Sequence, residues 1–214
     1  MVDAQVNDTG RLVDNLVDII IPVYSGVEEV KTCLASVLAS CNQCQGEIIV
    51  VNDCSPEPAI HSYLQTLAEE GLITLLVNPE NEGFVRTSNR ASAVRPERDF
   101  VLLNADTEVH GNWLDRMMSH AAAQARVATI TPFSNNATIA SYPWGGDRRE
   151  TEDDIRVASL DDAMRVANSG VAVALPTAIG FCMFVSREAW QAAGGFDERY
   201  GRGYGEEVEF CLAT

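Results

Sequence analysis

Short apolar runs alternate repeatedly along the sequence with stretches whose apolar residues recur at helical spacing. The first run, Val17 to Val23, is almost continuously apolar and contains a proline near its end, a pattern typical of a strand buried on both faces. Five such alternations with short connections predict an α/β domain with a mostly parallel central sheet and helices on both faces. We expect strands at Val17 to Val23, Glu47 to Val51, Ile73 to Val77, Phe100 to Leu103 and Val127 to Thr131, and helices at Glu28 to Ser40, His61 to Glu70, Phe84 to Val94 and Trp113 to Gln124.

The alternation stops after about Pro132. Beyond it, Leu160 to Asn168 predicts a short helix, and Phe181 to Val185 predicts another strand with a helix opening near Ser186. We interpret residues 1–16 as a flexible leader, because they lack the apolar core of a signal peptide, and residues 17–214 as one domain.

Charge and cysteine content exclude several classes of function. The formal net charge of -16 disfavours binding to nucleic acid or to anionic lipid. No run of about 18 apolar residues predicts a membrane-spanning helix. Cys41 and Cys44 form a C-x-x-C pair, but no second pair stands at zinc-finger spacing, so we expect incidental thiols in a reducing cytoplasm.

Ligands of open α/β sheets bind at the carboxyl ends of the strands, which directs attention to the polar residues there. Asp53 follows the second predicted strand, where its carboxylate suits the N–H groups of a nucleotide base. Alternatively, Asp53 or Ser55 caps the next helix, whose first turn Pro56 would suit.

Two further acidic segments allow two interpretations each. Asp106, with Asn104 as a neutral oxygen partner, could hold a divalent cation that neutralises a leaving diphosphate, or could form a polar turn. Glu206, Glu207 and Glu209 could favour the positive end of a helix, or one of them could act as general base on an acceptor hydroxyl.

Taken in order, these segments resemble family 2 of the inverting glycosyltransferases. The resemblance implies the GT-A fold, a nucleotide-binding α/β sandwich, in agreement with the alternation of strands and helices. It covers about Val17 to Leu212. The matching segments are Val17 to Tyr24, Ile48 to Ser55, Asn81 to Phe84, Leu102 to Asp106, Gly194 to Glu198 and Gly203 to Phe210.

The resemblance also implies roles for single residues and a single-displacement mechanism that inverts the anomeric configuration. Asp106 would hold Mg²⁺ or Mn²⁺, and Glu207 would be the catalytic base with Glu206 as its rival. The positions implied for the donor nucleotide, phosphate or sugar are Pro22, Val23, Tyr24, Asp53, Arg86, Asn89 and Asn104.

Three departures from the family pattern stand out. The metal motif has Asn104 where a carboxylate is usual, and Glu207 replaces the usual Asp. The chain ends at Thr214, a few residues into the helix of the acidic motif, so we expect a fragment with the C-terminal part of the domain missing.

The sequence therefore predicts a transferase that moves a sugar from a UDP-, GDP- or dTDP-type donor to a glycan or lipid-linked acceptor, in cell-surface polysaccharide synthesis. We expect it in the cytoplasm, where it could lie at the inner face of the membrane and touch it through segments outside this chain. The alternative is a non-catalytic module that binds nucleotide sugar or glycan within a larger protein. After its first predicted strand, the chain lacks the Gly- and Lys/Arg-rich loop of a nucleotidyltransferase. It also lacks the G-x-G-x-x-G of a dinucleotide-dependent oxidoreductase. Thr131 to Thr138 could contact sugar hydroxyls, and Trp144 could stack on an acceptor ring or simply pack.

Overall fold

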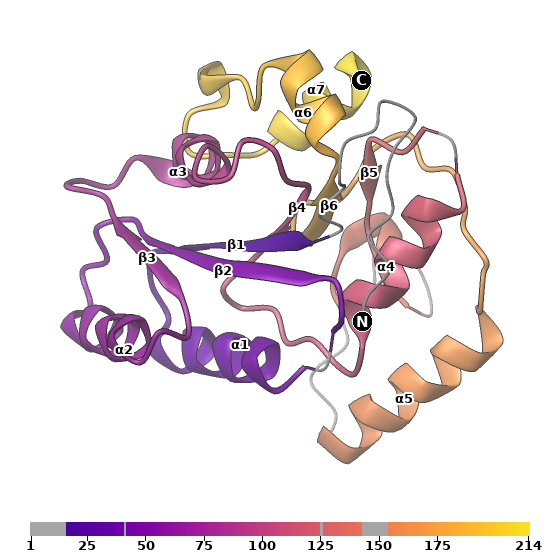
Figure 1. The fold of residues 1–214 in the computed structure, drawn as a ribbon, viewed down its shortest axis with the longest axis horizontal. Coiled ribbons are helices and arrows are strands. Elements are labelled where there is room, and N and C mark those ends of the chain that lie inside the picture. The colour runs from indigo at the N-terminus through magenta and orange to yellow at the C-terminus, as the bar shows by residue number, and fades with distance from the viewer. Residues whose placement is uncertain (1–15, 41, 125, 143–153) are drawn as a thin grey trace.

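A computed structural model describes residues 16–40, 42–124, 126–142 and 154–214. The predicted alternation of strands and helices is present from Val17 onward (Figure 1). In chain order the elements are β1 (Val17–Val23), α1 (Val27–Ala39), β2 (Gln45–Asn52), α2 (Pro58–Glu69), β3 (Thr74–Val77), α3 (Gly83–Ser92), β4 (Phe100–Leu103), α4 (Trp113–Ala122), β5 (Thr129–Ile130), η1 (Thr138–Ala140), α5 (Asp154–Ala167), β6 (Cys182–Val185), α6 (Arg187–Ala193), η2 (Glu198–Tyr200) and α7 (Glu206–Ala213).

Over the described ranges of the chain, the sheet has six strands in the order β3-β2-β1-β4-β6-β5. The first four strands pair in parallel. Strand β6 lies antiparallel between β4 and β5, so five strands point one way and β6 alone points the other way. The predicted mostly parallel sheet is confirmed, and β6 is the reversed strand that the pattern of apolar runs did not reveal.

Each central strand is apolar on both faces because each face supplies a separate core. In β1, Ile19 and Ile21 pack with α1, α2 and α4, whereas Ile20 between them packs with α3, α6 and α7. Strand β2 alternates in the same way. Figure 1 shows α1 and α2 below the sheet and α3, α6 and α7 above it, which confirms the predicted helices on both faces.

The upper core contains an aromatic cluster that joins three helices. The ring of Phe196, in the loop after α6, lies 4.9 Å from Trp190 of α6 and 5.7 Å from Phe210 of α7, centroid to centroid. Phe84 of α3 lies 6.2 Å from Phe196. Offset and edge-to-face aromatic pairs stabilise such packing beyond the apolar area they bury. The C-terminal helices are thereby fixed to α3.

The elements after β4 differ most from the predictions. Helix α5 begins at Asp154, six residues before the predicted start at Leu160, and β5 has two residues where five were expected. Strand β5 lies at the edge of the sheet and pairs with β6 alone, so little pairing defines its ends. No helix in the described part of the chain is long and apolar enough to span a membrane.

Candidate active site

The carboxyl ends of β1, β2, β3 and β4 meet at one edge of the sheet, and backbone hydrogen bonds tie the segments there together. The N–H of Asp53 donates to the carbonyl of Val23 at 2.8 Å, and the N–H of Asn78 donates to the carbonyl of Asn52 at 2.9 Å. The N–H of Asn104, after β4, donates to the carbonyl of Phe181, just before β6, at 2.8 Å. The predicted site segments after these strands therefore share one edge.

At the end of β1, only one of the three predicted donor-contacting side chains is well exposed. Tyr24 is 45% exposed, Pro22 is partly buried, and Val23 is buried in the lower core. The loop that follows is held by Gly26, whose φ of +90° suits glycine and whose N–H donates to Glu57 Oε1 at 2.7 Å. Tyr24 is thus the side chain that this loop offers to a ligand.

Asp53 is buried, and its carboxylate accepts three hydrogen bonds from groups some thirty residues further along the chain. Oδ1 accepts from the N–H of Glu82 at 2.8 Å and from Asn78 Nδ2 at 2.7 Å, while Oδ2 accepts from the N–H of Gly83 at 2.9 Å. The two backbone amides open α3, which has no side-chain cap of its own. Asp53 therefore caps α3 from the end of β2.

The alternative that Asp53 or Ser55 caps the next helix is wrong. The N-cap of α2 is Glu57, without a side-chain cap hydrogen bond. The N–H of Glu57 donates to Ser55 Oγ at 3.1 Å, and the N–H of Ser55 donates to Asn52 Oδ1 at 2.8 Å, which stabilises the turn before the helix.

Asn104 and Asp106 occupy the turn after β4. The carbonyl of Asn104 accepts from the N–H of Thr107 at 3.0 Å, and Thr107 Oγ1 donates to the carbonyl of Phe181 at 3.4 Å. The side chain of Asp106 is exposed and Asn104 is half-buried. Among the described residues no three His, Cys, Asp or Glu side chains gather closely enough to hold a metal ion. Of the predicted metal-site residues, the turn therefore offers the exposed carboxylate of Asp106 and the side-chain amide of Asn104, two residues earlier.

The two rival bases differ sharply in exposure. Glu206 is 5% exposed, and no donor in the described part of the chain reaches its buried Oε2. Burial raises the pKa of the Glu206 carboxyl above its ordinary range, and the neighbouring Glu207 adds to the rise. Glu207 is only partly buried, and its Oε2 accepts from the N–H of Gly205 at 3.3 Å. Of the pair, Glu207 is the carboxylate that solvent and a ligand can reach.

The loop before α7 is rich in left-handed backbone and lies against α3. Tyr204, with φ of +74°, is 98% exposed between two glycines of positive φ. A Cβ on Gly83 would come within 2.9 Å of Arg202 Cα, so only glycine fits there. Residues 201–205 lead into the acidic first turn of α7 and are named the acidic loop for that reason. Since Asp53 binds Gly83, the acidic loop is in contact with the segment anchored to the end of β2.

Arg86 and Asn89, both on α3, contact the segment between α6 and α7. Arg86 Nε lies 3.1 Å from Glu198 Oε2, with both side chains more than half exposed. Asn89 Nδ2 donates to the carbonyl of Phe196 at 2.9 Å, and its Oδ1 accepts from the N–H of Phe196 at 3.0 Å. In this arrangement both polar atoms of Asn89 are bonded to the backbone.

Sequence reasoning missed a buried polar network beside Asp53. Asn78 Nδ2, which donates to Asp53, also donates to Thr87 Oγ1 at 3.0 Å, and Arg90 contacts Asn78 Oδ1. Asn78 follows β3 at the same sheet edge, so the rule used for Asp53 and Asn104 would have found it. Thr87 and Arg90 carry no such signal, because they lie on a helix.

Of the C-x-x-C pair, only Cys44 lies among the described residues, and its surroundings oppose a reactive thiolate. The pKa of Cys44 is raised to about 12 by burial and by the nearby Asp115 carboxylate, which opposes the thiolate needed for metal or redox chemistry. Cys41 and Trp144 lie outside the described residues.

The glycosyl transferase family 2 model matches residues 18–191 of the chain. N-acetylgalactosaminyltransferase 7 of Drosophila melanogaster is 26% identical over 168 residues, which cover 71% of this chain and 28% of the relative. This chain thus spans less than a third of that relative's length.

Three solved structures share the fold at low sequence identity. GalNAc-T7 with UDP, GalNAc and Mn²⁺ superposes with a TM-score of 0.66 at 16% identity, covering 92% of this chain and 40% of that one. The mannosyltransferase PcManGT of Pyrobaculum calidifontis with GDP-Man and Mn²⁺ gives 0.57 at 19%, over 90% and 49% of the two chains. TarS residues 1–349 of S. aureus gives 0.61 at 12%, over 92% and 54%. The chain belongs to glycosyl transferase family 2 and has the GT-A fold of that family.

Proposed function

We propose that the chain is the donor-binding and catalytic core of an inverting glycosyltransferase. It moves a sugar from a nucleoside-diphosphate sugar to a hydroxyl of a glycan or lipid-linked acceptor. The observation that carries the proposal is the contact chain from Asp53 through Gly83 to Arg202, in the loop before α7 and its accessible Glu207. This chain links the start of α7 to the strand ends where Asp106 also lies. A donor lying along that edge would have a carboxylate near its phosphates and another near the acceptor.

The donor nucleotide is proposed to lie over the ends of β1 and β2. The exposed ring of Tyr24 offers a surface for the base, with Pro22 and the backbone of Val23 as the floor. Arg86 is an exposed cation on the helix that the acidic loop contacts, and its pairing with the exposed Glu198 is weak enough to exchange for a phosphate. Relatives solved with UDP or GDP-Man support a nucleoside-diphosphate donor.

Mg²⁺ or Mn²⁺ fits the chemistry of the turn after β4. Such hard cations take oxygen ligands and commonly bind through one or two carboxylates together with substrate phosphates. One exposed carboxylate at Asp106, with the Asn104 amide oxygen, agrees with this pattern and with the absence of a three-ligand cluster among the described residues. When bound, the cation would neutralise charge on the leaving diphosphate.

Glu207 is proposed as the general base. Its carboxylate takes the proton of the acceptor hydroxyl while that oxygen forms a bond to the anomeric carbon. The bond from the anomeric carbon to the diphosphate oxygen breaks, and the diphosphate leaves with the electron pair. Glu206 is buried beside it and is poorly placed to reach an acceptor.

Two features also agree with a second function, in which the chain is a non-catalytic module that binds nucleotide sugar or glycan within a larger protein. The metal turn has one carboxylate, and the chain covers less than a third of its curated relative. If the chain is a transferase, we propose that it acts in the synthesis of cell-surface polysaccharide. Its proposed location is the cytoplasm, at the inner face of the membrane.

Titration calorimetry with UDP, GDP and dTDP, with and without Mn²⁺, tests the donor site. We expect one nucleotide to bind in a metal-dependent way, and Asp106→Ala to abolish that dependence. Glu108→Ala, an exposed carboxylate two residues away, is the matched control and keeps it. Equal binding by the wild type and Asp106→Ala would remove Asp106 from the metal site.

Release of nucleoside diphosphate from the matching nucleotide sugar tests catalysis. We expect Glu207→Gln to lower kcat by about 10² to 10⁴, since that is the usual contribution of a positioned general base. Its affinity for the nucleotide should stay unchanged. Nucleotide binding without any turnover by the wild type would favour the binding module.

A further inference from the structure

Asn89 joins α3, whose first amides bind Asp53, to the turn after α6 that leads to the acidic motif. It lies on α3, half-buried, and faces the turn that follows α6. Its side-chain amide donates to the carbonyl of Phe196 and accepts from the N–H of the same residue, at 2.9 and 3.0 Å. This reciprocal pair copies the pairing of one residue with another across an antiparallel ladder. The backbone of Phe196 is thus held by a side chain.

The turn around Phe196 is shaped to receive that amide. Gly194 and Gly195 both have positive φ, and both N–H groups donate to the carbonyl of Trp190 at 3.0 Å. A Cβ on Gly195 would come within 3.0 Å of Asn89 Oδ1. Glycine at this position therefore permits both the backbone conformation and the close approach of Asn89.

The ring of Phe196 contacts α7, the helix that carries the acidic motif. Phe196 is 3% exposed, and its ring packs edge-to-face against the ring of the fully buried Phe210, 5.7 Å away between centroids. Phe210 lies one helical turn after Glu206 on α7, so its position sets where the start of that helix points. The path from Asn89 to the start of α7 consists of two hydrogen bonds and one aromatic contact.

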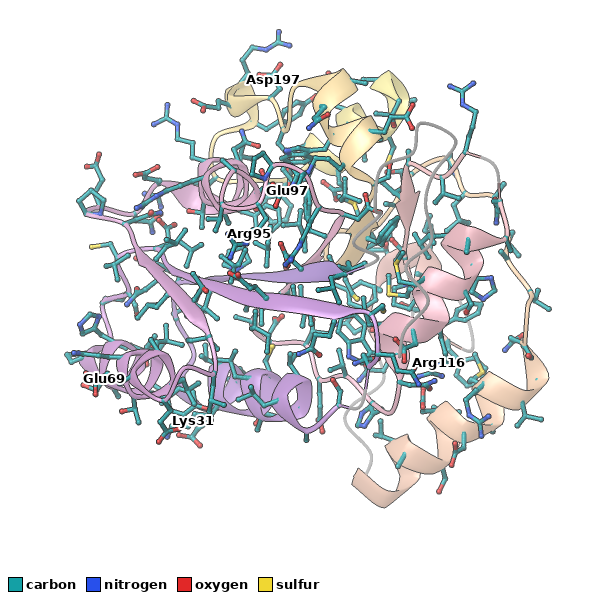
Figure 2. The ribbon with its side chains drawn as sticks, viewed as in Figure 1. Lys31, Glu69, Arg95, Glu97, Arg116 and Asp197 are labelled. Carbon is teal, nitrogen blue, oxygen red and sulfur yellow. The ribbon has the colours of Figure 1, made fainter. Side chains whose placement is uncertain are left out.

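The rest of the connecting segment is held less firmly. Between Phe196 and Glu206, α3 contacts it through the exposed Arg86–Glu198 pair, through the close approach of Gly83 to Arg202 and through the apolar Phe84, which lies beside Gly203. Asp197, labelled in Figure 2, directly follows Phe196 and lies away from the sheet. Exposed ion pairs contribute little free energy. The Asn89–Phe196 pair is therefore the principal polar anchor of the segment.

We propose that Asn89 is a positioning residue for the base Glu207, and that it acts by fixing the Phe196 turn instead of contacting the donor. This assignment rests on the proposed function. It predicts that removing the Asn89 amide harms turnover while leaving donor affinity intact. A direct contact with the donor phosphate or sugar predicts the opposite.

The test compares Asn89→Ala and Asn89→Asp in the full chain. The carboxylate of Asp can accept from the N–H of Phe196 but has no N–H to donate to its carbonyl. For both variants we expect kcat for nucleoside diphosphate release to fall on the order of 10²-fold, as for a catalytic group displaced by about 1 Å. Their affinity for the nucleoside diphosphate with Mn²⁺ should stay within about twofold of the wild type. Gly195→Ala should lower kcat similarly, and its effect should not add to that of Asn89→Ala.

Leu67→Ala is the control for a general loss of stability. Leu67 is 7% exposed in the lower core, on the face of the sheet opposite α3 and α7. We expect it to lower the Tm at least as much as Asn89→Ala while kcat stays near the wild-type value. A comparable fall of kcat in Leu67→Ala would overturn the positioning role.

Hydrogen exchange separates this proposal from the function it rests on. In Asn89→Ala the amides from Phe196 to Glu207 should exchange faster than in the wild type, while those of α1 and α2 stay unchanged. If the wild type shows no turnover, the proposed function fails. The exchange result alone then shows whether Asn89 fixes the Phe196 turn. Unchanged exchange in this segment, or a donor affinity that weakens in step with kcat/KM, overturns the proposal.

Discussion

Adjacent residues at the start of α7 meet opposite environments. Glu206 is buried, and one of its oxygens has no hydrogen-bond partner among the described residues, whereas Glu207 is accessible. Successive side chains on a helix point about 100° apart, so one of two neighbours can face the core while the other faces solvent. The sequence offered both as bases because their chemistry is the same. Only the packing of α7 distinguishes them, with Phe210 lying against Trp190 of α6 and against Phe196.

The burial of Glu206 predicts a pH-dependent cost to stability. Because its pKa is raised in the folded state, the native protein keeps this proton at pH values where the unfolded chain has released it. Stability therefore falls as the pH rises from the ordinary carboxyl pKa to the raised one. Glu206→Gln, which has no proton to lose, should gain free energy of unfolding over the wild type across that window, by about 1.4 kcal/mol for each pH unit that separates the two pKa values.

Urea unfolding of both proteins at about pH 4 and about pH 7 measures this difference. The advantage of Glu206→Gln should be larger at the higher pH. Glu108→Gln removes an exposed negative charge and reports the general effect of lowering the net charge. An advantage that is the same at both pH values, or equal to that of Glu108→Gln, would contradict a raised pKa at Glu206.

At the scale of elements, α3 is the piece on which the site depends. Its first amides bind Asp53 from β2, its middle binds Phe196 through Asn89, and its aromatic Phe84 packs under the segment that leads to α7. Helix α3 is short and begins with glycine, so its stability comes from these tertiary contacts more than from its own propensity.

Asp53→Ala tests this dependence. The change leaves the backbone N–H groups of Glu82 and Gly83, and one N–H of the Asn78 amide, without their acceptor, and unsatisfied buried donors are costly. We expect a loss of about 3 kcal/mol in the free energy of unfolding. Hydrogen exchange should accelerate in the first turn of α3.

Glu80→Ala, an exposed change in the loop just before α3, is the matched control and should be nearly neutral. Asp53→Ala also separates a structural role from base recognition. Unchanged stability combined with a lost affinity for nucleoside diphosphate would mean that Asp53 serves the ligand and not the helix.

The bounds of strands and helices could be predicted where they depend on the local pattern of apolar residues. β1 and β4 have the bounds that their apolar runs indicated, and α1 is displaced by one residue at each end. β2 extends beyond its apolar run because Val17 pairs with Gln45, a polar residue. The direction of β6 follows from its pairing with β4, between residues some eighty positions apart, and no local signal carries that information.

The site follows the same division. That polar residues after strands gather at one edge was foreseeable from the topology of parallel sheets, and Asp53, Asn104 and Asp106 do lie at strand ends. The partners of Asp53 and Asn89 were not foreseeable. Gly83 lies thirty residues after Asp53, and Phe196 lies 107 residues after Asn89, so each contact depends on how distant elements pack.

At the scale of the whole molecule, the net charge opposes the ligand proposed for it. The chain carries a formal charge of -16, and a nucleoside diphosphate is also an anion. Against this stand exposed arginines near the acidic loop, Arg86, Arg199 and Arg202. Long-range forces follow the total charge, whereas short-range contacts follow the local arginines, since screening by salt acts more strongly over longer distances.

The direction in which salt changes the association rate shows whether the negative net charge or the exposed arginines dominate the approach of the donor. We expect the association rate constant of the nucleoside diphosphate, measured by stopped flow at saturating Mn²⁺, to rise as the ionic strength increases from about 10 mM to about 150 mM. Over that range the Debye length falls from about 30 Å to about 8 Å, so repulsion by the acidic surface is screened before the contacts within the site are. The matching nucleoside, which is uncharged, is the control and should show no salt dependence. A rate constant that falls with salt would mean that the arginines beside the acidic loop attract the donor strongly enough to outweigh the charge of the whole chain.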